Sequence, residues 1–400
     1  MEVEVMGASS SLLEGRNSQS LSRFGVPWPE MNDGLFYKDT VKPGDSGMSL
    51  IEFYSSKYRD SAPKEGWVQR IQNGQIKVDG QVVTNSDSIL RLGSNLLYHR
   101  LPWKEPDVPY MVEVLFEDDH VLAINKPSGL QVLPGGSFQQ RTVFTQLCWR
   151  TYGPFSTLPE KYSEQKQHSV PVHRLGRGTS GILLCAKTKL AKVQLAGYFA
   201  DGASALTDDR SHRHIRDERV TRRRISKVYR GLATGILEKD QVTIDQPIGR
   251  ITYPGVAKGL YVACSSGKPA ESKVVVLERD LGRNCTLVQV EISSGRPHQI
   301  RIHLSFIGHP LLDDPLYGIG GIPKCSLPEL RDERIALDGG YCRPTKPIPG
   351  DCGYHLHAYQ LIFAHPVTNK VIKLTARLPA LLQTQQEHNC GSKAEELLVP

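Results

Sequence analysis

Short apolar runs separated by polar turns occupy the central part of the chain. The runs Val114–Phe116 and Val121–Ile124 flank an acidic turn and predict a β-hairpin. Residues 226–235 alternate between apolar and polar positions, as expected for a strand with two different faces. The apolar spacing in Leu190–Phe199 predicts an amphipathic helix, and residues 298–304 also show helical spacing. The pattern therefore indicates a domain that mixes strands with helices.

A second, smaller pattern precedes this domain. Apolar residues in Leu50–Tyr54 and around Trp67–Gln72 predict two short helices. Asn73-Gly74 is typical of a helix end, and the alternation in Ile76–Val78 predicts a strand. Asp79-Gly80 then predicts the tight turn of a hairpin. We expect a compact helix-turn-strand-hairpin unit here.

Composition shifts along the chain predict its domain boundaries. Residues 1–43 have poor apolar periodicity and many Ser, Asn, Gly and Pro residues, which predicts a flexible leader. Residues 44–101 form the small module, and a proline-rich stretch from 102 to 109 reads as a linker. The main domain is expected over 110–380, with a loose tail over 383–400.

Two segments of the main domain read as inserts, 201–224 and 319–352. The first is crowded with arginines; it fits both a solvated insert and an RNA-binding arm, and the sequence leaves the two readings open. The second holds Cys325, Cys342 and Cys352 near His355 and His357, but their spacing matches no common zinc site. We therefore expect no metal.

Composition narrows the class of protein. The 400 residues carry a net charge of +7 and a pI near 8.9, which fits a polyanionic partner. Eight scattered cysteines without a secretory signal predict reduced thiols in an intracellular protein, cytoplasmic or nuclear. Glu2 and Glu4 argue against a transit peptide, while the serine-rich stretch Ser9–Ser22 leaves an organellar address open. No apolar run approaches a membrane span, so we expect no membrane partner.

The stretch Pro171–Lys187 carries the most specific pattern. It places a basic pair before a glycine-rich turn that leads into a buried strand. Glycines at 176, 178 and 181 allow the backbone to bend or to approach a ligand closely. Arg174 and Arg177 have the forked guanidinium that suits phosphate or a base edge.

The residue order in this stretch resembles the central motif of RluA-type RNA pseudouridine synthases, His-Arg-Leu-Asp, two residues, then Thr-Ser-Gly. Further similarity to that family lies in Lys126–Gly129, in Lys227–Tyr229, and in Gly295–Leu304. The chain is identified as a eukaryotic, plant-like member. The resemblance implies an α+β fold, with a mixed, largely antiparallel central sheet, flanking helices and a preceding alpha-L RNA-binding module.

The resemblance also assigns roles to residues. Tyr229 would lie against the target base and aid proton transfer, and Arg301 would orient the catalytic carboxylate. The remaining matches are expected to contact RNA: His173, Arg174, Arg177, Thr179, Lys126, Arg296, His298 and Gln299. It implies a monomer that acts on tRNA or rRNA with neither metal nor small-molecule cofactor.

One position departs from the family motif. Gly176 stands where the family has its nucleophilic Asp, and glycine has no side chain to replace it. The leading prediction is still an RNA pseudouridine synthase, using another acid among Asp118, Asp119, Asp313 and Asp314. The alternatives are a catalytically silent RNA-binding protein of the same fold and an enzyme with a different base chemistry.

Overall fold

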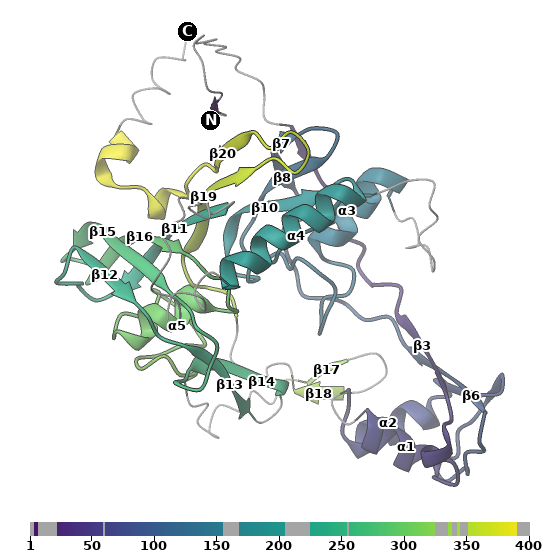
Figure 1. The fold of residues 1–400 in the computed structure, drawn as a ribbon. Helices are drawn as coiled ribbons and strands as arrows, with labels where there is room; N and C mark the ends of the chain where they lie inside the picture. Colours follow the sequence, from purple (N-terminus) through teal and green to yellow (C-terminus); the bar gives the residue numbers. More distant parts are fainter. Residues whose placement is uncertain are drawn as a thin grey trace, which may run out of the picture.

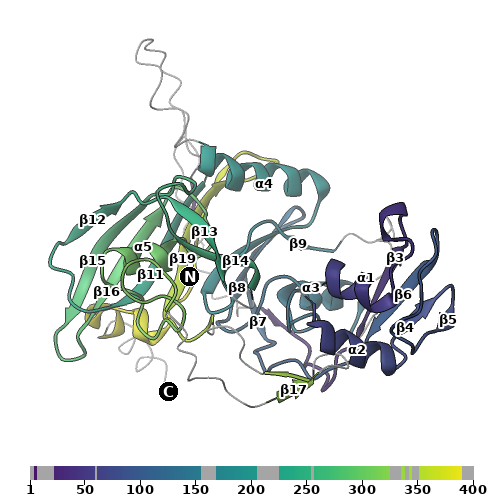
Figure 2. The same ribbon diagram turned by 90° about the horizontal axis from the view of Figure 1, so that it is seen from below.

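A computed structural model describes residues 4–6, 22–58, 61–154, 168–204, 225–253, 256–324, 335–337, 342–344 and 351–389. It contains a small module and a much larger sheet domain, and the module lies to one side of the large sheet in both views (Figures 1 and 2). Within the described residues, no helix is both long and apolar enough to cross a membrane.

The small module packs two helices on a four-stranded sheet. Helices α1 (Leu50–Lys57) and α2 (Lys64–Gln72) cover strands in the order β3 (Leu35–Thr40), β6 (Asn95–Arg100), β4 (Ile76–Val78) and β5 (Gln81–Val82). A capping box of Ser49 and Glu52 begins α1, and Gly74 leaves α2 with a φ of +70°. Trp67 lies fully buried at the centre of the module's own apolar core. The predicted helices, strand and hairpin are confirmed.

The predicted leader is only partly correct. Residues 35–40 form β3, which pairs with β6, and β2 (Arg23–Phe24) pairs with β7 at the edge of the large sheet. The expectation of a flexible leader is therefore wrong for residues 22–43. Its polar composition concealed these strands because each one adds to an existing sheet edge through backbone hydrogen bonds.

The large sheet has twelve strands. Its main path runs β12 (Gln241–Ile244), β15 (Ser272–Asp280), β16 (Cys285–Ile292), β11 (Ile225–Thr234), β19 (Leu356–Ala364), β10 (Ser180–Ala186), β8 (Val121–Lys126), β7 (Val112–Glu117), β2. Strands β1 (Glu4–Met6), β20 (Val371–Thr375) and β9 (Val170–Pro171) pair at its margins. Among these pairs only β10 with β19 is parallel, which confirms the mixed, largely antiparallel α+β fold.

Helices cover both faces of this sheet. Because side chains alternate along a strand, Ile182 and Leu184 of β10 meet α4 (Lys189–Ser204), whereas Leu183 and Cys185 meet α3 (Val143–Tyr152). Helix α5 (Gln299–Phe306) packs Ile300 and Leu304 against β15 and β16. Figure 1 shows α4 lying across β10.

The described residues also form two further hairpins and two 3-10 turns. They are β13 (Ile248–Tyr253) with β14 (Val256–Ala263), β17 (Ile335–Leu337) with β18 (Cys342–Pro344), and the turns Pro43–Asp45 and Ala380–Leu382. The arginine-rich stretch of the first insert lies outside the described residues, as does most of the second. The predicted tail is ordered over 383–389, where Glu387 accepts two hydrogen bonds from Arg230 of β11.

The linker is held to the large domain by one buried carboxylate. Glu105 is 1% exposed and accepts hydrogen bonds from the Asn32 side chain and from the backbone N–H groups of residues 139, 140 and 141. The Trp103 indole donates to the carbonyl of Ser137 close by. The proline-rich segment is therefore a fixed connection between the two parts.

Candidate active site

The Lys126–Gly129 motif contacts the His-Arg-Leu motif, which lies in the loop between β9 and β10. The Lys126–Gly129 segment at the end of β8 binds the backbone of this loop at residues 177 and 178. The Gly129 N–H donates to the Arg177 carbonyl over 2.9 Å, and the Ser128 hydroxyl donates to the Gly178 carbonyl over 2.7 Å. The loop that carries the His-Arg-Leu motif is therefore fixed by hydrogen bonds from the neighbouring strand.

Lys126 holds the loop from inside the protein. Its ammonium is fully buried and donates to the carbonyls of Pro127, Leu130 and Arg177 at 2.7–3.1 Å. Burial away from water lowers the pKa of Lys126 to about 7. An ammonium with three internal acceptors is not presented to RNA phosphate, so the placement gives Lys126 a structural role in place of the predicted RNA contact.

Gly176 and Gly178 form a cradle for one aromatic ring. A Cβ at Gly176 would stand 2.7 Å from the Tyr354 hydroxyl, and one at Gly178 would stand 2.8 Å from a Tyr354 ring carbon. The same hydroxyl lies 3.1 Å from the Thr179 hydroxyl. The space that a side chain at 176 would enter is therefore occupied by Tyr354.

Arg301 lies against the aromatic ring of Tyr354. Its guanidinium carbon is 4.1 Å from the centre of the Tyr354 ring. Nε and Nη2 each donate to the Asp314 carboxylate over 2.7 Å, in a pair that is 2% and 0% exposed. Burial lowers the pKa of Arg301, but the Asp314 hydrogen bonds outweigh it and the net shift is upward. The partner that orients Arg301 is thus Asp314.

One donor of Arg301 is left over. Among the described residues, Nη1 is buried and has no hydrogen-bond partner. A buried unpaired donor on a charged group is costly, so Nη1 can gain a hydrogen bond from an acceptor that enters the site. A carboxylate or a uracil oxygen has the acceptor chemistry that Nη1 requires.

Tyr229 lies between the two halves of the large sheet. Its ring packs against the apolar cluster of Leu175 and Ala358 and also against the cluster that contains Tyr354. Burial raises the pKa of Tyr229 to about 12, so the phenol stays neutral at physiological pH. The structure therefore brings Tyr229 to the same place as the glycine loop and Tyr354.

The predicted RNA-contact residues fall into two groups. Arg174 is exposed on the loop and makes no hydrogen bond within the described residues, and Arg296 is partly exposed. Thr179 and Gln299 are buried, and Gln299 bonds Ser294, Ser272 and two backbone groups. Gln299 therefore connects neighbouring segments inside the protein, and its side chain is not accessible for the predicted RNA contact.

Two predicted histidines hold the backbone and a neighbouring ring. His173 Nε2 accepts from the Leu184 N–H over 3.0 Å while its ring stacks on Phe199. His298 begins α5 with a left-handed φ of 56° and places Nδ1 2.9 Å from the Tyr317 hydroxyl. Burial lowers the pKa of both, to about 3 for His173 and, with added repulsion from Arg301, to about 4 for His298. Both rings are therefore neutral at physiological pH.

The acids that the sequence offered in place of residue 176 do not suit that role. Asp314 is fully buried and also accepts from the backbone N–H groups of residues 316 and 317, so its oxygens are occupied. Asp118 Oδ2 lies 2.9 Å from His365 Nε2, at the opposite end of β8 from Lys126 and roughly 15–20 Å along the strand. Asp119 is its exposed neighbour, and Asp313 is 69% exposed beside His355.

Two residues of this site were missed in the sequence. Asp351 pairs with Arg177 through Nε over 2.8 Å and through Nη2. Tyr354 follows three residues later; Asp351 lies at the end of the segment that read as an insert, and Tyr354 lies just beyond it. No pattern marks them, because only the return of the chain to β19 brings them to the glycine loop.

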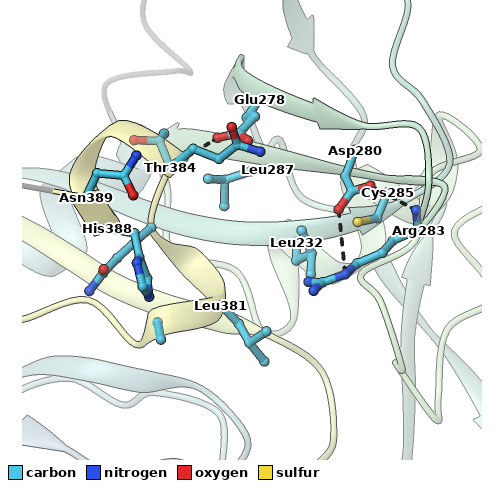
Figure 3. Close-up of a pocket in the computed structure, with 13 residues that line it drawn as sticks. Leu232, Glu278, Asp280, Arg283, Cys285, Leu287, Leu381, Thr384, His388 and Asn389 are labelled. Carbon is cyan, nitrogen blue, oxygen red and sulfur yellow. Dashed lines mark hydrogen bonds and ion pairs between the residues drawn. The ribbon is translucent and has the colours of Figure 1, made fainter. Parts of the chain in front are cut away.

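A separate cavity of about 460 Å³ lies elsewhere (Figure 3). It opens between the β15–β16 hairpin and residues 380–389 and holds none of the predicted site residues. Its carboxylates are engaged: Asp280 pairs with Arg283, and Glu278 accepts from the Gln385 N–H. Leu232 at its edge lies three residues from Tyr229 on β11, an odd separation that places it on the opposite sheet face. Across the described part of the chain, no cluster of His, Cys, Asp and Glu could hold a metal ion.

Comparison with known proteins identifies the same family as the sequence motifs. The profile of a family described as RNA pseudouridylate synthase matches residues 120–306. A protein called RNA pseudouridine synthase 5 from Oryza sativa subsp. japonica is 59% identical over 94% of this chain and 94% of its own length. Its namesake from Arabidopsis thaliana is also 59% identical, over 91% of this chain and 98% of its own.

More distant similarity reaches bacteria. A protein called ribosomal large subunit pseudouridine synthase D, from Vibrio parahaemolyticus, is 27% identical over 87% of this chain and 93% of its own length. The matches extend over the small module as well as the large sheet domain. The two plant proteins are therefore similar to this chain over nearly its whole length.

Proposed function

The chain belongs to the RNA pseudouridylate synthase family, as a plant-like member of its RluA type, and we propose that it isomerises uridine to pseudouridine in RNA. The family's reaction detaches uracil from its ribose and rejoins it through carbon. RNA is accordingly the partner of this family. The similarity to pseudouridine synthases lends no support to the alternative, a catalytically silent RNA-binding protein.

One structural observation carries the proposal for this chain. Among the described residues Arg301 Nη1 has no hydrogen-bond partner, and its guanidinium lies on Tyr354 in a site that also contains the glycine loop and the Tyr229 ring. A fixed cation stabilises negative charge that develops on a leaving base far better in a buried site than in water. Tyr229, as a neutral phenol, can stack on the base and hydrogen-bond to it. Arg174, whose side chain is exposed on the loop, is available to hold the opened RNA strand.

The class of RNA, the oligomeric state and the cellular compartment are further parts of the proposal. We propose tRNA or rRNA as substrate, supported by the ribosomal subunit in the name of the Vibrio relative. We also propose a monomer in an intracellular compartment, cytoplasmic or nuclear. Five cysteines of the described residues support this setting, since each of them is a free thiol.

The test is pseudouridine formation by the purified protein. Total cellular RNA carrying tritium at uridine C5 is incubated with the full chain, because joining C5 to the ribose releases that tritium to water. Release in step with protein, and pseudouridine in the digested RNA, is the expected result. Arg301→Lys, which keeps the charge but loses the forked pairing with Asp314, should lower the rate at least tenfold. No release from any RNA fraction overturns the proposal.

A further inference from the structure

The missing nucleophile leaves a chemical gap at the proposed site. The isomerisation needs a group that bonds to the ribose while the base is detached, and Gly176 cannot provide one. Asp314 is buried and its oxygens already accept hydrogen bonds. Asp118 and Asp119 lie at the far end of β8, and Asp313 is exposed to solvent beside His355. A replacement must reach the glycine loop, carry a free oxygen and remain accessible to RNA.

Asp351 meets these conditions. Its backbone carbonyl lies 3.0 Å from where a Cβ of Gly178 would stand, so the residue touches the loop two positions after Gly176. Both hydrogen bonds from Arg177 reach Oδ1, and among the described residues Oδ2 has no partner. The Asp351 side chain is 43% exposed, which leaves that oxygen open to a ligand.

We propose that Asp351 is the catalytic carboxylate of this chain, delivered to the glycine loop from the segment before β19. The inference rests on the proposed function. Arg177 then takes the orienting role that the family resemblance assigned to Arg301, because it grips the carboxylate by one oxygen. Arg301, already neutralised by Asp314, keeps Nη1 free for the charge that appears on the base.

The proposed step balances without a further reactant. Oδ2 of Asp351 forms a bond to ribose C1′ while the bond from C1′ to uracil N1 breaks, and the electron pair leaves with the base. The detached uracil turns, C5 bonds to C1′, and the ester bond breaks to return the carboxylate. The C5 proton is then lost to solvent and N1 takes up one proton, so no oxidant is needed.

The neighbouring thiol is the competing nucleophile. Cys352 follows Asp351, and its sulfur donates to Oδ1 over 3.8 Å. Burial, and then the charge of Asp351, raise the pKa of this thiol. Since the thiolate is the reactive form, Cys352 is poorly suited to attack the ribose.

The experiment compares variants of the full chain in the single-turnover tritium assay. Asp351→Asn keeps the shape but loses the charge, and the rate should fall at least about 100-fold. Asp313→Asn is the matched control, since it removes a nearby exposed carboxylate, and its rate should stay within about twofold. RNA affinity and melting temperature are measured beside each rate to separate chemistry from binding and folding.

A second variant distinguishes a catalytic from a structural carboxylate. Asp351→Ala leaves room for a small anion, so added formate should restore part of the rate, which a purely structural loss would not permit. Asp351→Asn working within about threefold of the wild type overturns the role of Asp351 and leaves the proposed function standing. Failure of formate to restore any rate in a folded Asp351→Ala chain counts against it as well. A wild type with no activity overturns the proposed function, and the role of Asp351 with it.

Discussion

Two buried cations, Lys126 and Arg301, flank the proposed site, and they differ in the groups that accept their hydrogen bonds. On the β8 side, Lys126 donates to three carbonyls and has no carboxylate partner within the part of the chain that the structure describes. On the α5 side, Arg301 has a bidentate carboxylate partner, Asp314, and its Nη1 has no hydrogen-bond acceptor among the described residues. The hydrogen bonds of Lys126 hold a loop in place. Arg301 is neutralised by its carboxylate partner and can still bind a ligand.

The contrast shows how residues of one charge in one site serve different purposes. A lysine bound only by neutral carbonyls loses part of its preference for the charged form when it is buried. An arginine paired with a buried carboxylate stays charged and can still offer Nη1. The chemistry is therefore expected at the Arg301 side, and the shape of the loop at the Lys126 side.

Breaking the charge balance of Arg301 should have the largest effect on stability. Asp314→Asn leaves a buried guanidinium without its counter-ion, so the free energy of unfolding should fall by about 3–5 kcal/mol. Urea denaturation measures the change. The exposed neighbour provides the control, since Asp313→Asn should shift the same quantity by under about 0.5 kcal/mol. Equal effects of the two changes would contradict the buried pair.

Removing the brace on the other side should cost somewhat less. Lys126→Met preserves the length of the side chain but leaves three carbonyls without their donor, so unfolding should become easier by roughly 2–3 kcal/mol. The loop should also lose order, which hydrogen exchange at the amide of Gly129 would report. Lys187→Met, at a partly exposed pair with Glu117, is the control and should cost less than about 1 kcal/mol. A Lys126→Met chain as stable as that control would refute the brace.

The cradle between the two cations can be tested by filling it. Gly176→Ala places a Cβ 2.7 Å from the Tyr354 hydroxyl and should destabilise the protein by about 1–3 kcal/mol. Tyr354→Phe removes that oxygen, so the double variant should recover most of the loss in a thermal melt. Gly197→Ala in α4 meets nothing within 4 Å and should be neutral or stabilising. Loss without recovery in the double variant would show that Tyr354 does not occupy this space.

The smallest effect is expected in the pH dependence of stability. His173 and His298, one on each side, have their pKa lowered to about 3 and about 4. Between those values and about 6.5 the unfolded chain binds more protons than the folded one, so stability falls as pH falls through this window. Replacing either histidine with Gln should reduce the slope of unfolding free energy against pH by up to one proton. His309→Gln is the comparison, and an unchanged slope in both site variants would contradict the buried neutral rings.

Much of the architecture was predictable because it rests on local signals. The Asp79-Gly80 turn, the hairpin at 114–124 and the strand at 226–235 each follow from residues that are adjacent in sequence. The short strands at Arg23–Phe24 and Leu35–Thr40 were not predictable, because their pairing depends on edges made by distant residues. The burial of Lys126 and Gln299, which were predicted to contact RNA, was not predictable for the same reason, since burial is a property of the assembled fold.

The sequence by itself determined the family, the order of the motifs and the absence of a side chain at 176. Those features depend on residue identity and short spacing, which a chain carries before it folds. Only the tertiary structure decided that Asp314 balances Arg301, that Tyr354 fills the glycine cradle, and that Asp351 reaches Arg177. The last contact joins residues 174 positions apart, and it exists because β19 lies beside β10 and returns the segment before it to the loop.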